Sequence, residues 1–262
     1  MSSDKMISRR ENGVGWMILN NPERHNAISL EMWEAALEIM ADFAADPSVR
    51  VMVVTGAGGK AFASGADISK FQDERQEATA LAHYQVTTQK AYSAMQAMTI
   101  PTIAMVRGYC IGGGTALAVC CDLRICNDKA KFGVPAAKLG LGYGLGRAKP
   151  LVDLVGPAFA KEMFFTGRQF DASEAERMGL VNRVVADADL EATVEAMART
   201  IADNAPLTVR CSKLVVGEVM KDAGERNVAA TEAAVAACFA SNDYKEGQTA
   251  FMEKRKPLFT GT

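Results

Sequence analysis

The sequence predicts an α/β fold followed by a C-terminal helical region, and three observations support this. Val51 to Thr55 is a β-branched, fully apolar run, typical of a strand buried on both faces of a parallel sheet. A unit of strand, glycine turn and helix occurs twice before residue 127. From Pro157 onward the sequence is alanine-rich and has helical periodicity, so helices dominate its final third.

Length and composition limit the class of protein. The chain of 262 residues can bury a large core, as one α/β domain or as a domain with a helical appendage. Its net charge of -2 gives no electrostatic support to nucleic-acid binding. The polar N-terminus lacks the apolar stretch of a signal peptide, and the uncharged apolar run from Gly108 to Cys121, 14 residues long, is too short to span a membrane. We therefore expect a cytoplasmic protein without nucleic-acid or membrane partners.

The expected elements alternate between strand and helix in the first part of the chain. Residues 15–20 form a short strand, and Ser29 is the expected N-cap of the helix that follows. The buried strand at 51–55 comes next. After two small-residue turns, a long helical region continues to about Met98. Residues 102–106 form another apolar strand, which leads into a glycine-rich stretch.

That stretch contains three adjacent glycines, Gly112 to Gly114, followed by the compact run T-A-L-A-V, which predicts a buried helix. Adjacent glycines suit a backbone that turns sharply or that another molecule approaches closely. The first N–H groups of a helix lack intrahelical partners and point toward the preceding loop, so a carbonyl oxygen gaining negative charge can bind there. A tight strand-to-helix turn accounts for the same residues without any ligand.

The later part of the chain is mainly helical. We expect strands at 122–126 and 182–185 and helices near 158–166, 173–179, 189–203, 207–221, 226–240 and 244–254. The glycines between 140 and 146 do not match the dinucleotide-binding pattern. The six cysteines and two histidines lack the spacing of a metal site, so we expect buried, reduced thiols and no metal.

Six motifs carry a resemblance to a known family. They are, in chain order, A-F-A-S-G-A-D-I, I-P-T-I-A-M-V-R-G-Y-C-I-G-G-G, D-L-R-I, A-K-F-G-V-P, F-T-G-R-Q-F-D-A-S-E-A-E-R-M-G-L-V-N and F-M-E-K-R-K-P. In this order they resemble the enoyl-CoA hydratase/isomerase (crotonase) superfamily over nearly the whole chain. The resemblance implies a crotonase-like core of ββα units in a spiral at residues 1–195, and a C-terminal helical trimerisation region at 196–262. It also implies homotrimers or homohexamers that act on acyl-CoA thioesters, with no cofactor besides the CoA of the substrate.

The resemblance further implies the positions of the substrate contacts. The oxyanion hole of the family uses two backbone N–H groups, which fall at Ala66 and Gly113 here. Fixed backbone dipoles suit an enolate or tetrahedral oxyanion, and loss of one such donor typically costs about 3–4 kcal/mol of transition-state stabilisation. The CoA contacts carried over by motif are Arg24, Ala63, Asp67, Ile68, Ile111, Pro135, Ala136 and Lys254. Lys254 is equally well explained as a solvated charge, and Asp67 as a turn or cap residue.

Two positions depart from the family pattern. Hydratases of the superfamily have glutamates where this chain has Ala116 and Ala136. Hydration needs one group to deprotonate water and another to protonate carbon, each typically contributing about 10²–10⁴-fold, and alanine does neither. We therefore expect an acyl-CoA lyase or isomerase that works through a stabilised enolate, with its hydratase activity in question.

Lys138, Tyr143 and Arg147 are the candidates to replace the glutamates. Tyr143 lies, to within a residue, where acyl-CoA decarboxylases of the family carry a tyrosine, although an ordinary half-buried aromatic would fit the same position. Decarboxylation of a malonyl-type CoA thioester is therefore one alternative. A non-catalytic CoA-binding homologue is another.

Overall fold

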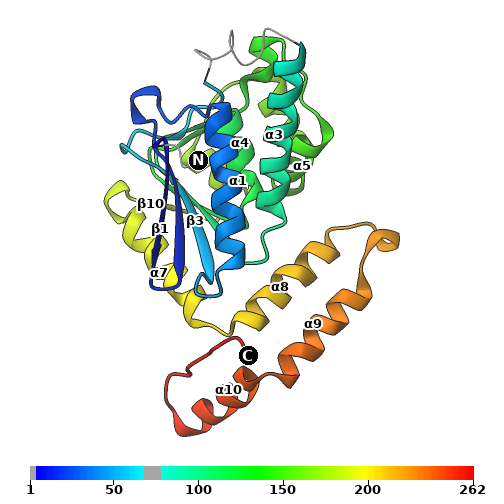
Figure 1. Cartoon of the computed structure of the whole chain (residues 1–262). Helices are drawn as coiled ribbons and strands as arrows, with labels where there is room; N and C mark the ends of the chain where they lie inside the picture. The colour runs from blue at the N-terminus through cyan, green and yellow to red at the C-terminus, as the bar shows by residue number, and fades with distance from the viewer. Residues whose placement is uncertain (1–3, 68–77) are drawn as a thin grey trace.

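The computed structural model describes residues 4–67 and 78–262. Figure 1 shows strands and helices packed into a body, from which α8 (Pro206–Val219), α9 (Val228–Ala240) and α10 (Asn242–Glu253) extend. We call these three helices the arm and the rest of the chain the body. The C-terminus returns to the arm, where the Asn242 N–H donates to the Thr262 carbonyl at 2.7 Å.

A six-stranded sheet is the frame of the body, in the order β1-β2-β3-β5-β7-β10. Only β1 and β2 are antiparallel to each other, and the other neighbouring pairs are parallel. The strands are β1 (Met6–Glu11), β2 (Val14–Leu19), β3 (Val51–Gly56), β5 (Thr102–Val106), β7 (Leu123–Asn127) and β10 (Arg183–Val185). Parallel pairing explains why β3 and β5 are apolar on both faces.

A second sheet of four short strands has the order β4-β6-β8-β9. These strands are β4 (Ala61–Ala63), β6 (Tyr109–Ile111), β8 (Lys131–Gly133) and β9 (Phe170–Asp171). β4, β6 and β8 follow β3, β5 and β7 after short turns, so strand pairs alternate between the two sheets. This arrangement confirms the predicted α/β fold of ββα units with C-terminal helices.

Helices cover both faces of the six-stranded sheet. α7 (Leu190–Asp203) packs on one face, against alternate residues of β3 such as Val51 and Val53. Met52 and Val54 point to the other core, which includes side chains of α1, α3 and α4. The remaining body helices are α1 (Leu30–Ala45), α3 (Ala78–Gln96), α4 (Gly113–Cys120), α5 (Leu145–Thr166) and α6 (Ala172–Arg177), with 3-10 turns η1 (Pro22–Arg24) and η3 (Pro135–Leu139).

Local sequence signals fix several helix starts. Ser29 is the N-cap of α1, as predicted, and its Oγ accepts from the Met32 N–H at 3.4 Å. α6 begins with a capping box, in which Asp171 Oδ1 accepts from the Glu174 N–H at 2.9 Å and Glu174 Oε2 accepts from the Asp171 N–H at 3.0 Å. A cap of this kind typically stabilises a helix start by about 1 kcal/mol.

Some elements differ from the sequence prediction. α5 starts at Leu145, well before the helix expected near 158–166, and bends at Gly156, whose φ is 74°. Pro157 follows the bend. Proline has no N–H to donate to the preceding turn, so the helical hydrogen bonds are interrupted there. β1 was not predicted, since five of its six residues are exposed and the strand lacks an apolar alternation. β4, β6, β8 and β9 are too short to show a period of two.

Few residues of the arm are buried, and both hydrophobic core clusters lie in the body. The predicted boundary between residues 195 and 196 falls inside α7, which packs on the sheet along its length through Leu190, Val194, Ala198 and Ala202. The helices that extend from the body begin at Pro206. Large apolar side chains of the arm are exposed, namely Val216, Val219, Met220, Val228, Val235, Phe239, Tyr244, Phe251 and Met252.

The cysteines of the body are buried and reduced, as predicted. Cys110, Cys120, Cys121 and Cys126 are buried, whereas Cys211 and Cys238 on the arm are half-buried. Burial raises the pKa of the Cys120 and Cys126 thiols to about 12, so these thiols stay protonated near neutral pH. Within residues 4–67 and 78–262, no helix is long and apolar enough to cross a membrane.

Candidate active site

Two backbone loops meet at the start of α4. One follows β4 and contains Gly65 and Ala66, and the other joins β6 to α4 and contains Gly113. A Cβ placed on Gly113 would lie 3.7 Å from the Cα of Gly65, and a Cβ placed on Gly65 would lie 3.6 Å from the Gly113 nitrogen. The structure therefore brings the two predicted oxyanion donors onto neighbouring backbone segments.

The pairing of this first loop with Ile28 orients the Ala66 N–H. The Ile28 N–H donates to the Gly65 carbonyl at 2.8 Å, and the Asp67 N–H donates to the Ile28 carbonyl at 3.1 Å. Because peptide groups alternate in direction along an extended chain, the Ala66 N–H points away from Ile28. It has no hydrogen-bond acceptor among the described residues.

Gly113 is the first residue of α4, so its N–H has no intrahelical acceptor. The preceding Gly112 has a φ of 56° and donates its own N–H to the Gly133 carbonyl at 2.7 Å, which anchors the loop to β8. In the described part of the chain the Gly113 N–H also lacks an acceptor outside the helix. The positive end of the α4 dipole thus lies at an N–H that is free to bind an anion or a polarised oxygen.

Small residues make this close approach possible. Gly65 has a φ of 102°, a conformation that other residues rarely adopt. A Cβ on Gly114 would lie 2.3 Å from the Ala63 carbonyl oxygen, so a larger residue there would separate α4 from β4. The positive φ of Gly65 thus shapes the first loop, and the absence of a side chain at Gly114 lets α4 pack on β4.

Tyr92 is a site residue that the sequence prediction missed. It comes from α3, and its hydroxyl lies 3.4 Å from the Gly113 carbonyl oxygen, to which it donates a long hydrogen bond. Its ring packs edge-on against Trp33 with the ring centroids 5.0 Å apart. Trp33 is buried, and its indole Nε1 has no partner among the described residues. Burial raises the pKa of Tyr92 well above its ordinary value, so the phenol stays protonated.

Tyr143 lies close to this group. It precedes α5, its ring packs against Phe164 at 4.9 Å between centroids, and the Arg147 guanidinium lies over it at 5.2 Å. Burial raises the pKa of Tyr143 to about 12, an effect that the Arg147 charge partly offsets. The charge of a Tyr143 phenolate would raise the pKa of Tyr92 further, so the two phenols are electrostatic neighbours. Of the three predicted replacements for the glutamates, Tyr143 and Arg147 therefore lie together.

Ala116 and Ala136 are the alanines that we predicted to stand in place of two glutamates. Ala116 lies one turn into α4 and is 3% exposed, and Ala136 lies in η3 and is 9% exposed. Pro135 begins η3, and its Cδ would lie 3.9 Å from a Cβ on Gly112, so η3 is adjacent to the oxyanion loop. At both positions the chain offers a buried methyl group.

Several predicted CoA contacts gather beside the Ala66 loop. Arg24 ends η1, and its Nη1 lies 3.3 Å from Oδ1 of the buried Asp67. This ion pair ties η1 to the residue after Ala66. The Ile111 carbonyl would lie 3.2 Å from a Cβ on Gly65, so the end of β6 adjoins the same loop. Ala63 is fully buried in β4.

The other predicted contacts are not brought to this site within one chain. Ile68 lies outside the described residues. Lys254 is the exposed C-cap of α10, on the part of the arm that Figure 1 shows far from α4. Lys138 was predicted not as a CoA contact but as the third candidate to replace the glutamates. It lies in η3 with its side chain along Gly167, at the end of α5, where a Cβ on Gly167 would be 3.2 Å from the Lys138 Cγ.

Known proteins share this architecture. The sequence profile of the enoyl-CoA hydratase/isomerase family matches residues 9–262. This chain belongs to that family. A crotonyl-CoA hydratase of Syntrophomonas wolfei is 37% identical over 263 residues, which cover 99% of this chain and 99% of the relative. A short-chain-enoyl-CoA hydratase of Clostridium acetobutylicum is 33% identical, over 98% of this chain and 97% of that protein.

The structural comparison agrees with the sequence comparison. The crystal structure of an enoyl-CoA hydratase/carnithine racemase from Magnetospirillum magneticum superposes with a TM-score of 0.94, at 38% identity, and covers 100% of this chain and 97% of that one. The predicted crotonase superfamily membership and fold are therefore confirmed. The chain is an acyl-CoA enzyme of the enoyl-CoA hydratase/isomerase family.

Proposed function

We propose that the chain binds an acyl-CoA thioester with its thioester oxygen between the N–H groups of Ala66 and Gly113, and that it stabilises the enolate of that thioester. The observation that carries this proposal is the contact between the two loops, with both N–H groups lacking an acceptor among the described residues. The thioester oxygen becomes negative as the α-carbon becomes a carbanion. Fixed backbone dipoles stabilise that charge without having to reorganise.

We further propose that hydration is not the main reaction, because Ala116 and Ala136 stand where hydratases of the family carry glutamates. Both alanines are buried beside the oxyanion loops, and a methyl group can neither activate water nor protonate carbon. The curated relatives above are named as hydratases, so this feature would distinguish the chain from the proteins it is similar to.

Decarboxylation of a malonyl-type thioester is the second candidate, and the phenols of Tyr92 and Tyr143 favour it. In this reaction the bond between the α-carbon and the carboxylate breaks, and CO₂ leaves. The bonding electrons remain on the α-carbon as the enolate, so no general base is needed. A proton then adds to the α-carbon. A phenol that stays protonated because burial raises its pKa can orient the carboxylate or supply this proton.

Two other candidates remain in the proposal. Double-bond isomerisation needs an acid–base group such as Asp67, whose carboxylate is buried next to Arg24. A non-catalytic CoA-binding homologue would keep the oxyanion hole but would not convert any substrate. In each case we propose that main-chain groups near Arg24, Ala63, Asp67 and Ile68 hold the CoA, with Ile111, Pro135 and Ala136 beside the thioester.

We also propose that residues 196–262 mediate assembly into a homotrimer or homohexamer. The exposed apolar side chains of the arm support this, because covering them would bury a large apolar area. In such an assembly Lys254, the C-cap of α10, would bind a CoA phosphate held by a neighbouring copy.

The experiment that tests the reaction is a substrate panel. Purified protein is incubated with enoyl-, hydroxyacyl-, malonyl- and methylmalonyl-CoA thioesters, and the products are followed by mass. Loss of CO₂ from a malonyl-type thioester, abolished by Gly113→Val, supports decarboxylation at the proposed hole. Conversion of an enoyl thioester to a positional isomer supports isomerisation. Binding without any change in mass supports the non-catalytic alternative.

A further inference from the structure

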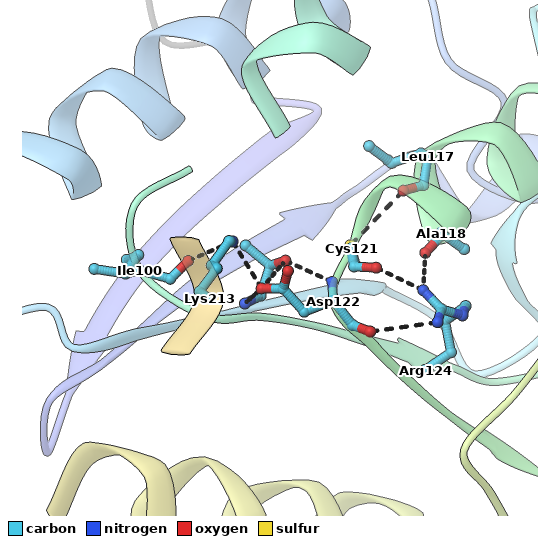
Figure 2. A network of polar contacts seen from close by, with 8 residues as sticks. Ile100, Leu117, Ala118, Cys121, Asp122, Arg124 and Lys213 are labelled. Atoms are coloured by element: carbon cyan, nitrogen blue, oxygen red, sulfur yellow. Dashed lines mark hydrogen bonds and ion pairs between the residues drawn. The ribbon is translucent and has the colours of Figure 1, made fainter. Parts of the chain in front are cut away.

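A buried guanidinium lies at the opposite end of the helix that carries Gly113. Arg124 comes from β7 and is 3% exposed. Figure 2 shows its side chain at the C-terminal end of α4, directed at the last carbonyl groups of that helix. Because α4 has eight residues and a helix rises 1.5 Å per residue, about 12 Å separate Arg124 from the proposed hole, so it does not touch the substrate.

Arg124 donates almost all of its N–H groups to carbonyl oxygens. Nη1 donates to Ala118 at 3.2 Å and to Cys121, the C-cap of α4, at 2.5 Å. Nη2 donates to the Asp122 carbonyl at 3.3 Å, and Nε donates to Leu180 at 2.7 Å. Of these carbonyls, that of Ala118 belongs to the last turn of α4, where it also accepts from the Cys121 N–H at 3.2 Å, and that of Cys121 belongs to the C-cap.

No carboxylate neutralises this guanidinium in the part of the chain that the structure describes. The nearest candidate, Asp122, is engaged elsewhere. Its Oδ2 accepts from the Thr102 N–H at 2.7 Å. It also forms an ion pair with Lys213 Nζ at 2.7 Å, which Figure 2 shows. Desolvation lowers the pKa of Arg124, in keeping with a cation surrounded mainly by dipoles. Its compensating negative charge is therefore the C-terminal end of α4 and adjacent backbone carbonyls.

We propose that Arg124 is a positioning residue for the oxyanion hole, acting through α4. It holds the C-terminal end of the helix in place, which fixes the Gly113 N–H against the Ala66 loop. Its charge also offsets the negative end of the helix dipole, which would otherwise weaken the stabilisation of an anion at the other end. This inference rests on the proposed function, since it concerns how the protein keeps the oxyanion hole able to polarise a thioester carbonyl.

The test measures the polarisation of a bound thioester carbonyl directly. Acetyl-CoA labelled with ¹³C at the thioester carbonyl is bound at saturation, and its C=O stretching band is recorded by infrared difference spectroscopy. In the wild type the band is expected to move to lower wavenumber on binding. In Arg124→Met most of this shift is lost, and Arg124→Lys, which keeps the charge but has fewer donors, retains part of it. With the thioester that the substrate panel shows to be converted, kcat is expected to fall about 10-fold in Arg124→Met, while KM changes little.

Arg50 provides the matched control. It likewise donates to a carbonyl near the end of a helix, with Nη1 bound to Ala202 of α7 at 2.9 Å, but α7 lies on the other face of the large sheet. Arg50→Met is expected to keep the full infrared shift. A full shift in either folded Arg124 variant would overturn the proposal. So would failure of both variants to fold while Arg50→Met folds, because Arg124 would then be needed for the fold as a whole. Absence of a shift in the wild type would instead contradict the proposed hole itself.

Discussion

α7 and α9 are both alanine-rich helices of the C-terminal third, yet only α7 is covered by the rest of the chain. Leu190, Val194 and Ala198 of α7 are 0% exposed against the large sheet. α9 has no buried residue, and its Phe239 is 62% exposed. Burial of one large apolar side chain is typically worth about 1.5–3 kcal/mol. The core of the body is thus buried within one chain, whereas the arm carries an exposed apolar surface.

The largest effect is expected from a substitution in the body that removes turnover without changing the arm. Gly113→Val would place side-chain atoms next to the Tyr92 hydroxyl, which lies 3.4 Å from a Cβ at that position, and would displace the N–H donor. Loss of one such donor typically lowers kcat by about 10²–10³-fold. We expect at least this loss in turnover, with the molecular mass from light scattering the same as that of the wild type.

The control for this variant is Gly224→Val, since Gly224 lies in an exposed turn between α8 and α9 with no atom near its Cβ position. It is expected to keep both activity and thermal stability. Wild-type turnover in Gly113→Val would remove the proposed oxyanion hole.

The second prediction concerns a substitution that disrupts assembly through the arm while the body stays folded. Phe239→Glu puts a charge into the exposed apolar surface, so the proposed trimer or hexamer is expected to dissociate to a monomer, measured by light scattering. Ile7→Glu is the matched control, because Ile7 is a 41% exposed apolar residue of the body. If the wild type is already a monomer at micromolar concentration, the proposed role of the arm is wrong.

A third prediction concerns the junction between the two regions. Lys213 of α8 donates to Asp122 at 2.7 Å and to the Ile100 carbonyl at 2.9 Å (Figure 2), and its side chain is only 17% exposed. Removing a hydrogen-bonding partner from a charged group in such a setting costs about 1.5–3 kcal/mol, so Lys213→Met should lower the urea midpoint clearly.

Lys256 and Asp203 form the exposed counterpart at 2.6 Å, with the Lys256 side chain 70% exposed. Exposed pairs are worth about 0–1 kcal/mol, so Lys256→Met should shift the midpoint much less. Equal shifts in the two variants would mean that the Lys213–Asp122 pair does not hold α8 to the body.

The smallest effect is a pH dependence. The folded-state pKa of Tyr143 is raised by burial to about 12, above its ordinary value of 10.0. The stabilisation linked to its neutral form is complete below pH 10 and is lost as the pH rises through about 12. Urea unfolding at pH 9 and pH 11.5 should therefore show a smaller alkaline loss in Tyr143→Phe than in the wild type. An identical loss would mean that the phenol is not shielded from water.

The sequence predicted the elements with strong local signals. Ser29 and the apolar run at 51–55 were found because a cap and a β-branched strand have composition cues. The order of the motifs predicted that the Ala66 and Gly113 loops act together, and the structure brings these loops into contact.

Other features depend on tertiary packing and had no local signal. Tyr92 lies on a helical stretch whose buried side also includes Tyr84, Thr88 and Met95, so the pattern indicated burial but could not indicate contact with Gly113. The exposure of α9 could not be read from its composition, which resembles that of a buried helix. The role of Arg124 depends on which carbonyls surround it, and these come from three separate elements or turns.

The most direct test of the central claim is the rate of crotonyl-CoA hydration by the wild-type protein, measured beside CO₂ release from malonyl-type thioesters. Two missing acid–base contributions of about 10²–10⁴-fold each predict hydration at least about 10⁴-fold slower than in a competent hydratase. Rapid hydration, unaffected by Tyr143→Phe and without CO₂ release from any malonyl-type thioester, would contradict the interpretation of Ala116 and Ala136.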